Sequence, residues 1–279
     1  MKTAKTGARA AAIAAALIAV LAALAAPICK SPGGGGAYAS SFWRQTPAEG
    51  IWSAEAPIAG SDGETLRLLK IDMNSYTAEI MTSGSRGRRA LSIRDMTIGS
   101  GLSAGINASY FDEDYRPLGY LRTRGGVVND YIAEPIIYSG VIQLANGGLS
   151  IVHRSDFSRA GASEAVQIGP RLISGGVRTR GLENTIDYRK RARRAGIGTD
   201  DRGNAILAVT SAGSTANWKQ MTDTMLSLKH AGIRTFINLD GGSSAQIYAE
   251  SGGRAIMDER GVAVPVGIGF RKRARAGLR

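Results

Sequence analysis

Glycine makes up 37 of the 279 residues, about twice its usual share, and these glycines follow no triplet repeat. Glycine adopts backbone conformations that other residues avoid, so the excess predicts many tight turns between short strands. The lack of a repeat excludes collagen. Apolar residues supply 43% of the chain and charged residues 21%, which is enough apolar content for one large globular domain. The sequence therefore predicts an ordered chain rich in short strands.

Cysteine and histidine are too scarce to build a disulfide framework or a metal centre. Cys29 is the single cysteine, and His153 and His230 are the two histidines. An intrachain disulfide, a cysteine-ligated zinc site and a multi-histidine centre are excluded. The chemistry must come from carboxylates, amides, hydroxyls, arginines and backbone groups. No cofactor is predicted, and binding of calcium or magnesium at the carboxylates is left open.

The net charge of +12 is concentrated at the two ends of the chain. Residues 1–39 and 271–279 carry nine of these charges, which leaves +3 for the body. No basic stripe with interleaved aromatics and no groove-reading helix accompanies the charge. We therefore predict no nucleic-acid partner.

The amino terminus has the organisation of an export signal. Three basic residues precede an apolar run over residues 10–28, and a glycine-rich stretch follows. Candidate cleavage sites are Ala37-Tyr38-Ala39 and Ala23-Leu24-Ala25. The 19-residue run would also span a bilayer of about 30 Å, so an uncleaved membrane anchor is the alternative. We expect a periplasmic or extracellular protein with a signal or anchor at 1–39, one domain at 40–270 and a basic tail at 271–279.

Apolar periodicity predicts strands joined by short turns, together with two helices. A hairpin is expected from strands 64–71 and 76–82, and further strands at 103–108, 119–123, 139–144, 149–153, 164–168, 205–210, 233–239 and 265–270. One helix covers 91–98 with Ser92 as its N-cap; the second is capped by Ser214, ends at Gly232 and packs one apolar face on the core, with Trp218, Met221, Met225 and Leu228. Strands 205–210 and 233–239 are predicted to be parallel neighbours across this helix. The predicted fold is a single mixed α/β (α+β) domain with a strongly twisted, mostly β-sheet core and a few packed helices.

Three clusters place polar residues where a strand gives way to a turn. They are INASYFDEDYRPLGY from Ile106, RRAGIG from Arg193 and INLDGGSSAQIY from Ile237. Glycines at such points let a ligand approach the backbone, and successive amides there can bind an anion. The segment from Gly241 to Ala245 also loosely fits a nucleophile elbow, but both histidines precede it, so the chain order of that enzyme class is not met.

Together these clusters resemble the phosphodiester glycosidase family. The family's strings correspond here to residues 107–111 with Pro117 and Gly119, to 169–172 (GPRL), to 194–198 (RAGIG) and to 238–244 (NLDGGSS). The resemblance extends over residues 64–270. Ser109 replaces a common glycine or methionine, and Ala195 replaces a common hydroxyl residue, which affects substrate detail more than family membership.

The resemblance implies hydrolysis of a sugar-1-phosphodiester at the glycosidic carbon–oxygen bond, with a phosphorylated or anionic glycan as the partner. A phosphodiester is a good leaving group, so a cation, a carboxylate and a means of activating water suffice. The expected roles are nucleophile or base for Asp240, phosphate binding for Arg194 and sugar binding for Asn107. Asp112 is the first candidate for the second carboxylate and Glu134 the next. Substrate-binding positions are Gly241, Gly242, Ser243, Tyr110, Phe111, Gly119 and Pro170.

Each site residue also has a structural interpretation. An Asp-Gly-Gly after a strand is by itself most often a turn, and the loop at Asp112 and Asp114 has the composition of a solvated turn. The alternative function is an exported, non-catalytic envelope protein that binds an anionic glycan or a phosphate-bearing polymer. The catalytic interpretation requires Asn107, Arg194 and Asp240 to lie together in the folded chain.

Overall fold

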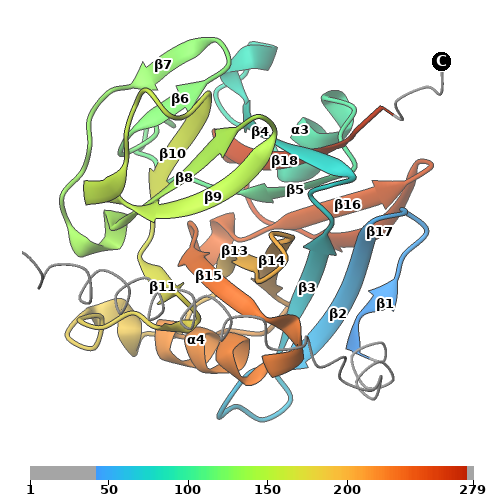
Figure 1. The fold of residues 1–279 in the computed structure, drawn as a ribbon, viewed down its shortest axis with the longest axis vertical. Coiled ribbons are helices and arrows are strands. Elements are labelled where there is room, and N and C mark those ends of the chain that lie inside the picture. The colour runs from blue at the N-terminus through green and yellow to red at the C-terminus, as the bar shows by residue number, and fades with distance from the viewer. Residues whose placement is uncertain (1–41, 275–279) are drawn as a thin grey trace, which may run out of the picture. The chain divides into compact units, whose positions relative to one another are not determined.

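The computed structural model describes residues 42–274, which form three antiparallel sheets (Figure 1). The larger sheet has eight strands, in the order β1 (Arg44–Gln45), β2 (Ile51–Pro57), β3 (Thr65–Ile71), β14 (Ala205–Thr210), β13 (Ala195–Asp200), β15 (Ile233–Asn238), β11 (Arg171–Ser174) and β12 (Val177–Arg178). A five-stranded sheet has the order β7 (Gly126–Asn129), β6 (Leu121–Thr123), β10 (Glu164–Ile168), β8 (Gly140–Ala145) and β9 (Gly148–His153). The other has the order β17 (Arg254–Glu259), β16 (Ile247–Ser251), β5 (Ala104–Asn107), β18 (Val266–Lys272) and β4 (Tyr76–Thr82).

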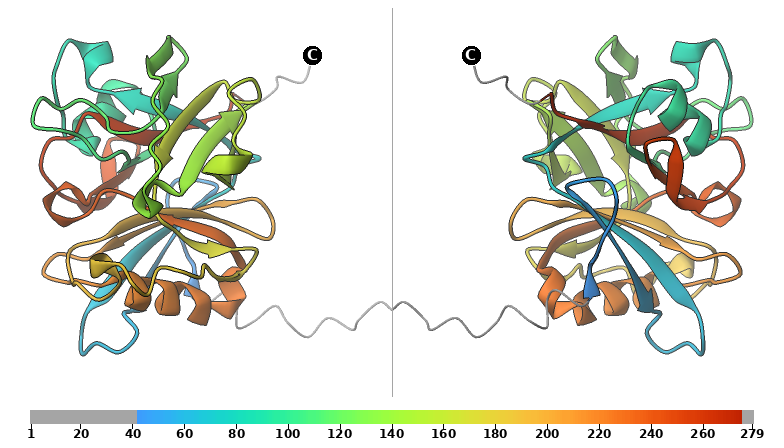
Figure 2. Two further views of the ribbon diagram at one scale, coloured as in Figure 1. Left: turned by 90° about the vertical axis from the view of Figure 1, so that its left-hand side faces the viewer. Right: turned by 90° about the vertical axis from the view of Figure 1, so that its right-hand side faces the viewer.

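The central strands of the larger sheet are buried on both faces, as their nearly continuous apolar sequences require. In β14, Ile206 and Ala208 belong to one apolar cluster, whereas Leu207 and Val209 belong to another. The first cluster packs under helix α4 (Trp218–Ser227), and the second packs against the two smaller sheets. Figure 2 shows this arrangement, with α4 on one side of the larger sheet and the smaller sheets on the other.

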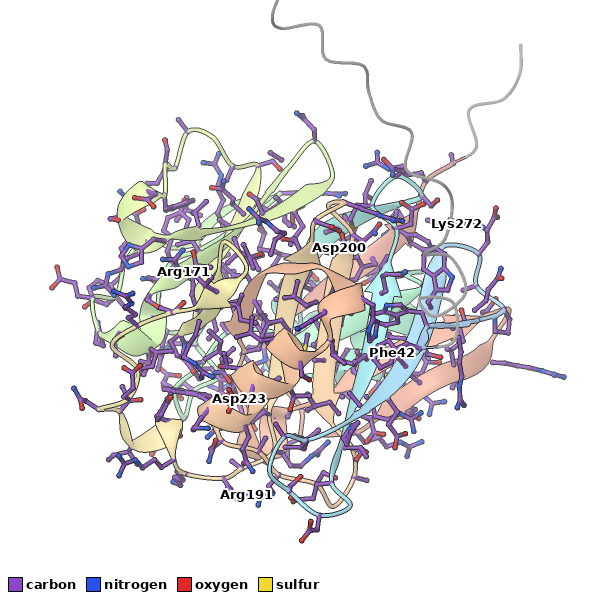
Figure 3. All side chains as sticks on the ribbon, turned by 60° about the horizontal axis from the view of Figure 1, so that its bottom comes forward. Phe42, Arg171, Arg191, Asp200, Asp223 and Lys272 are labelled. Carbon is purple, nitrogen blue, oxygen red and sulfur yellow. The ribbon has the colours of Figure 1, made fainter. Side chains whose placement is uncertain are left out.

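Helix α4 lies on the sheet through Trp218, Met221 and Met225, all buried. Its N-cap is Asn217, in a capping box with Gln220, and the predicted cap Ser214 instead bonds the backbone N–H of Thr65 at 3.1 Å. The prediction started the helix three residues too early because Ser and Asn are both good caps. Its predicted end at Gly232 is also wrong, because α4 ends at Ser227 and Gly232 instead caps the 3-10 turn over residues 229–231. The outer side of α4 carries Asp223, labelled in Figure 3, which pairs with Lys219 and Arg178.

Helix α3 (Ile93–Gly99) begins at the predicted cap, since the Ser92 side chain accepts a hydrogen bond from the backbone of Asp95. Short 3-10 turns are η1 (Gly84–Arg86), η2 (Ile136–Tyr138), η3 (Arg154–Asp156), η4 (Ile186–Tyr188), η5 (Lys229–Ala231) and η6 (Gly242–Ser244). The described residues contain two α-helices, so the mixed α/β label overstates the helix content of a fold that is mostly antiparallel sheet.

The predicted hairpin is wrong, although both of its strands and its turn are present. β3 pairs with β2 and β14, whereas β4 pairs with β18 in another sheet. The turn at Asp72 holds a tight bend through its own backbone and side-chain bonds, and these do not depend on whether the flanking strands pair. The turn therefore carries the chain from one sheet to another.

The predicted adjacency of β14 and β15 is also wrong. Both strands pair antiparallel with β13, so they run in the same direction but with β13 between them. Gly196 and Gly198 in β13 leave room for the ring of Phe236, because a Cβ at either position would lie within 3.0 Å of that side chain. The connection from β14 through α4 to β15 therefore passes over β13, which lies between these two strands.

The ends of the domain differ slightly from expectation. β18 continues through Arg271 and Lys272, and Arg271 pairs with Glu79 at 2.9 Å, so the first residues of the predicted basic tail belong to the sheet. The predicted signal and its cleavage sites lie outside the described residues. In residues 42–274, no helix is both long enough and apolar enough to cross a membrane.

Candidate active site

Asp240 lies two residues beyond the end of β15, an interior strand of the larger sheet. Its carboxylate accepts hydrogen bonds from the Ser244 hydroxyl and the Gly241 N–H. Burial raises the pKa of Asp240 to about 6, and these two hydrogen bonds oppose the rise. Asp240 is therefore ionised at neutral pH with a pKa close to it, which suits a nucleophile or a general base.

Asn107 ends β5 and contacts Asp240 from the neighbouring sheet. Its Nδ2 donates to the backbone oxygen of Asp240 at 2.7 Å, and its Oδ1 accepts from the backbone N–H of Gln246 at 3.0 Å. The Asp240 N–H donates to Ala108 at 3.1 Å. The structure thus brings Asn107 and Asp240 together, and the observed contacts of Asn107 position Asp240. Its contact with a sugar stays a prediction.

Arg194 enters β13 and is 5% exposed. Its Nε donates to the Ala216 oxygen at 3.0 Å, its Nη2 donates to the Lys190 oxygen at 2.7 Å, and the guanidinium lies 5.5 Å from the Trp218 ring centre. A Cβ on Gly241 would lie 3.7 Å from Nη1, so Arg194 lies beside the residue that follows Asp240. Protein groups already occupy much of the fork that was expected to hold phosphate. Nη1, which has no hydrogen-bond partner among residues 42–274, is the donor left for a ligand.

Asp187 is a carboxylate of this site that sequence reasoning missed. It lies in η4, and its Oδ1 is 3.2 Å from Nη2 of Arg194. Both Asp187 and Asp240 act electrostatically on the Tyr110 hydroxyl, while Arg194 acts in the opposite sense. No periodic or motif signal surrounds Asp187, because it comes from an irregular segment between two strands of the larger sheet.

The Tyr110 hydroxyl links Asn238, the last residue of β15, to the backbone of Gly169. Its hydroxyl donates to the Gly169 oxygen at 2.7 Å and accepts from Nδ2 of Asn238 at 3.1 Å. Burial raises the pKa of Tyr110, and the charge of Asp240 adds to the rise. Pro170 follows Gly169 through a cis peptide bond and accepts from the Asn238 N–H at 3.0 Å. The predicted positions Tyr110 and Pro170 therefore lie in the Asp240 neighbourhood.

The glycine-rich turn after Asp240 differs from the prediction in which of its groups contact the carboxylate. The Gly242 N–H donates to the backbone oxygen of Arg193 at 2.8 Å, so that amide is occupied. Ser243 is exposed, whereas Ser244 is buried and bonds the carboxylate. Two adjacent serines in a turn give no sequence signal of which one points inward.

Within residues 42–274, the other carboxylate candidates make no hydrogen bond or ion pair with Asp240, Arg194 or Asn107. Oδ1 of Asp112 accepts from the backbone N–H groups of Asp114 and Arg116 at 2.9 and 2.8 Å, which is the turn interpretation of this loop. Glu134 is exposed and has no ion pair or hydrogen bond with residues 42–274. Asp187 is thus the second carboxylate that the structure places near Asp240 and Arg194.

Phe111 and Gly119 support the loop rather than touch Asp240. Phe111 packs with the apolar cluster around Met81 and α3 and stacks on Tyr115. Gly119 has φ +88° and lies against the buried Gln167, where a Cβ would approach that side chain within 3.1 Å. In residues 42–274, the His, Cys, Asp and Glu side chains form no group of three that could hold a metal ion.

The comparisons with known proteins concern the family and the fold. The family model for phosphodiester glycosidases matches residues 100–271, a span that contains Asn107, Arg194 and Asp240. Among curated proteins, none matches the sequence. The zebrafish N-acetylglucosamine-1-phosphodiester alpha-N-acetylglucosaminidase catalytic domain, solved as auto-inhibited by its pro-peptide, has a TM-score of 0.61 at 14% identity over 83% of this chain and 87% of its own.

Two further solved structures have similar folds. A hypothetical protein from Synechocystis has a TM-score of 0.60 at 14% identity. The match covers 81% of this chain but only 63% of that protein. A putative exported protein from Burkholderia pseudomallei has a TM-score of 0.52 at 12% identity, over 75% of this chain and 74% of its own. At these identities the likeness concerns the fold.

Proposed function

Because this chain belongs to the phosphodiester glycosidase family, we propose that it hydrolyses the glycosidic bond of a sugar-1-phosphodiester, with Asp240 as the reacting carboxylate. One observation carries the proposal. Asp240, with a pKa of about 6, is held at its backbone oxygen by Asn107, and Arg194 lies beside the next residue, Gly241, although these residues come from three separate segments of the chain. Asp240 is partly buried and Arg194 is buried, and a carboxylate with a cation nearby is the pair that the reaction needs.

In the proposed mechanism, Asp240 acts in its ionised form. It either attacks the anomeric carbon, giving a glycosyl ester that water then hydrolyses to free sugar and the carboxyl, or removes a proton from the attacking water. In both routes positive charge develops on the sugar ring as the bond breaks. The bond that breaks joins the anomeric carbon to the phosphate oxygen, and the electron pair leaves with the phosphate. A phosphate leaving group needs little protonation, and Nη1 of Arg194 stabilises its charge. Asp187 and the two carbonyls hold Arg194 in place for this contact.

The test is turnover of a panel of sugar-1-phosphodiesters by the purified protein, followed by NMR of the products. Release of free sugar is the expected result, and Asp240→Asn should abolish it while leaving the fold intact. Release of sugar-1-phosphate would mean cleavage of the phosphorus–oxygen bond and would contradict the mechanism. Binding without turnover in both proteins would favour the non-catalytic glycan-binding function.

We also propose that the protein is exported. The support is the basic and apolar amino terminus, whose pattern is that of a signal. Fractionation of cells that produce the full chain, with and without residues 1–39, tests this. Equal retention of both forms inside the cell would contradict export.

A further inference from the structure

A cavity of about 440 Å³ lies beside the loop that begins at Phe111. Its lining includes Arg88 and Arg89 after β4, Tyr115 and Pro117 in the loop, and Val128 in β7. We propose that this cavity, here named the basic groove, binds the leaving-group side of the substrate when that side carries a further phosphate. The assignment to the leaving group rests on the proposed function. Binding of a phosphate-bearing chain in the groove can be measured without turnover.

The chain path connects the groove to Asp240 over a short distance. The Asp240 N–H donates to Ala108, and the Ala108 N–H donates to Val266, which lines the groove. Each hydrogen-bonded step between backbones is about 4.8 Å, so the backbones of Asp240 and Val266 are about 10 Å apart. Tyr110 and Phe111, which are adjacent in sequence, contact the Asp240 cluster and the groove loop respectively. The groove therefore lies about 10 Å from the Asp240 backbone, the span that a substrate with a second phosphate on its leaving group would have to cover.

The charges at the groove favour an anion. The guanidinium groups of Arg88 and Arg89 are exposed and have no ion pair or hydrogen bond with residues 42–274. Arg116 also lines the groove, but it pairs with Asp114 at 3.4 Å, and these two charges offset each other. Two uncompensated positive charges remain. Arginine binds phosphate through paired N–H groups, so a phosphate is an anion that these two side chains can hold.

The remaining wall of the groove is aromatic and apolar. Tyr115 stacks on Phe111 with ring centres 5.5 Å apart and an interplanar angle of 14°, and Tyr115 is 37% exposed. Its φ of +62° is in the left-handed region that large side chains rarely adopt, and the hydrogen bonds of Asp112 hold the loop in this form. Val128 adds an exposed apolar surface. A carbon chain or sugar ring next to a phosphate would cover these groups.

Calorimetric titration tests the binding directly. The probe is a trimer of glycerol phosphate, and the proteins are the wild type, the double variant Arg88→Gln/Arg89→Gln and a charge-matched control. The control is Arg44→Gln/Arg254→Gln, because both residues are exposed, have no side-chain partner in the described part of the chain and do not line the groove. We expect at least a tenfold loss of affinity in the groove variant and wild-type affinity in the control. Equal affinity in all three proteins, or an equal loss in both variants, would overturn the proposal.

Kinetics then test the assignment to the leaving group. Two sugar-1-phosphodiesters are compared, one with a methyl leaving-group substituent and one with glycerol phosphate in that place. We expect the ratio of kcat/KM for the second substrate over the first to fall at least tenfold in the groove variant and to keep its wild-type value in the control. An unchanged ratio in the groove variant would refute the assignment. If the wild type hydrolyses neither substrate, the proposed function fails, and the calorimetric result still decides whether the groove binds phosphate.

Discussion

Replacement of Asp240 by asparagine should change how the stability of the protein depends on pH. The carboxyl has an ordinary pKa of 3.8 and a pKa of about 6 in the folded protein, because burial disfavours its charged form. Between these two values the folded protein keeps a proton that the unfolded chain has released. The free energy of unfolding therefore falls as the pH rises through this window, and the loss is complete above about pH 6.

The size of the effect follows from the pKa rise. One pKa unit corresponds to about 1.4 kcal/mol, so the rise amounts to about 3 kcal/mol over the whole window. About 2 kcal/mol of this falls between about pH 4 and about pH 7.5, since the unfolded chain is already partly ionised at the lower pH. Asp240→Asn removes the titrating group, so its stability relative to the wild type should improve by about 2 kcal/mol on going from the lower pH to the higher.

Urea unfolding at the two pH values measures this difference. Comparing each variant with the wild type at both pH values cancels the pH dependence of all other groups and the loss of any hydrogen bond that does not depend on pH. Asp62→Asn is the matched control, because Asp62 is exposed and has no side-chain partner in the described part of the chain. The control should show no such change. A relative stability of Asp240→Asn that is the same at both pH values would refute the claim that burial perturbs this carboxyl.

Three further predictions concern the neighbours of Asp240. Ser244→Ala should raise the pKa of Asp240 further, because the serine hydroxyl stabilises the carboxylate; the acidic limb of the kcat/KM profile should move above about pH 6, whereas Ser243→Ala should leave it in place. Asn107→Ala should lower the free energy of unfolding by about 1–3 kcal/mol in chemical denaturation, because two buried backbone groups lose their partner; a loss below about 0.5 kcal/mol would contradict the positioning role. Arg194→Lys keeps the charge but loses the branched contacts, so kcat/KM should fall at least tenfold by initial-rate measurement, and full activity in this variant would argue against the contact with phosphate.

Much of the local structure could be predicted from the sequence because its causes are local. The cap at Ser92 and the buried face of α4 follow from residue types at fixed spacings, and most strand positions follow from alternation. The pairing of strands could not be predicted in the same way. The turn at Asp72 looks the same whether the chain returns beside β3 or leaves for another sheet, and only the burial of β3 on both faces separates these outcomes.

The candidate site shows the same division. The strings around Asn107, Arg194 and Asp240 were sufficient to select these residues, and the fold brings them together. The residues that contact them could not be predicted from the sequence in this way. Asp187 lies in an irregular segment, and Ser244 differs from Ser243 only in the direction of its side chain.

Residue types and their spacing along the chain were enough to identify the family, to select Asp240 as the candidate carboxylate and to predict most strands, because these depend on neighbours within a few positions. Burial set the pKa of Asp240, and the packing of three sheets set which amide, hydroxyl and carboxylate meet it. Those properties depend on solvent exclusion and on contacts between residues more than a hundred positions apart, such as Asn107 and Asp240, and they exist only once the sheets have packed.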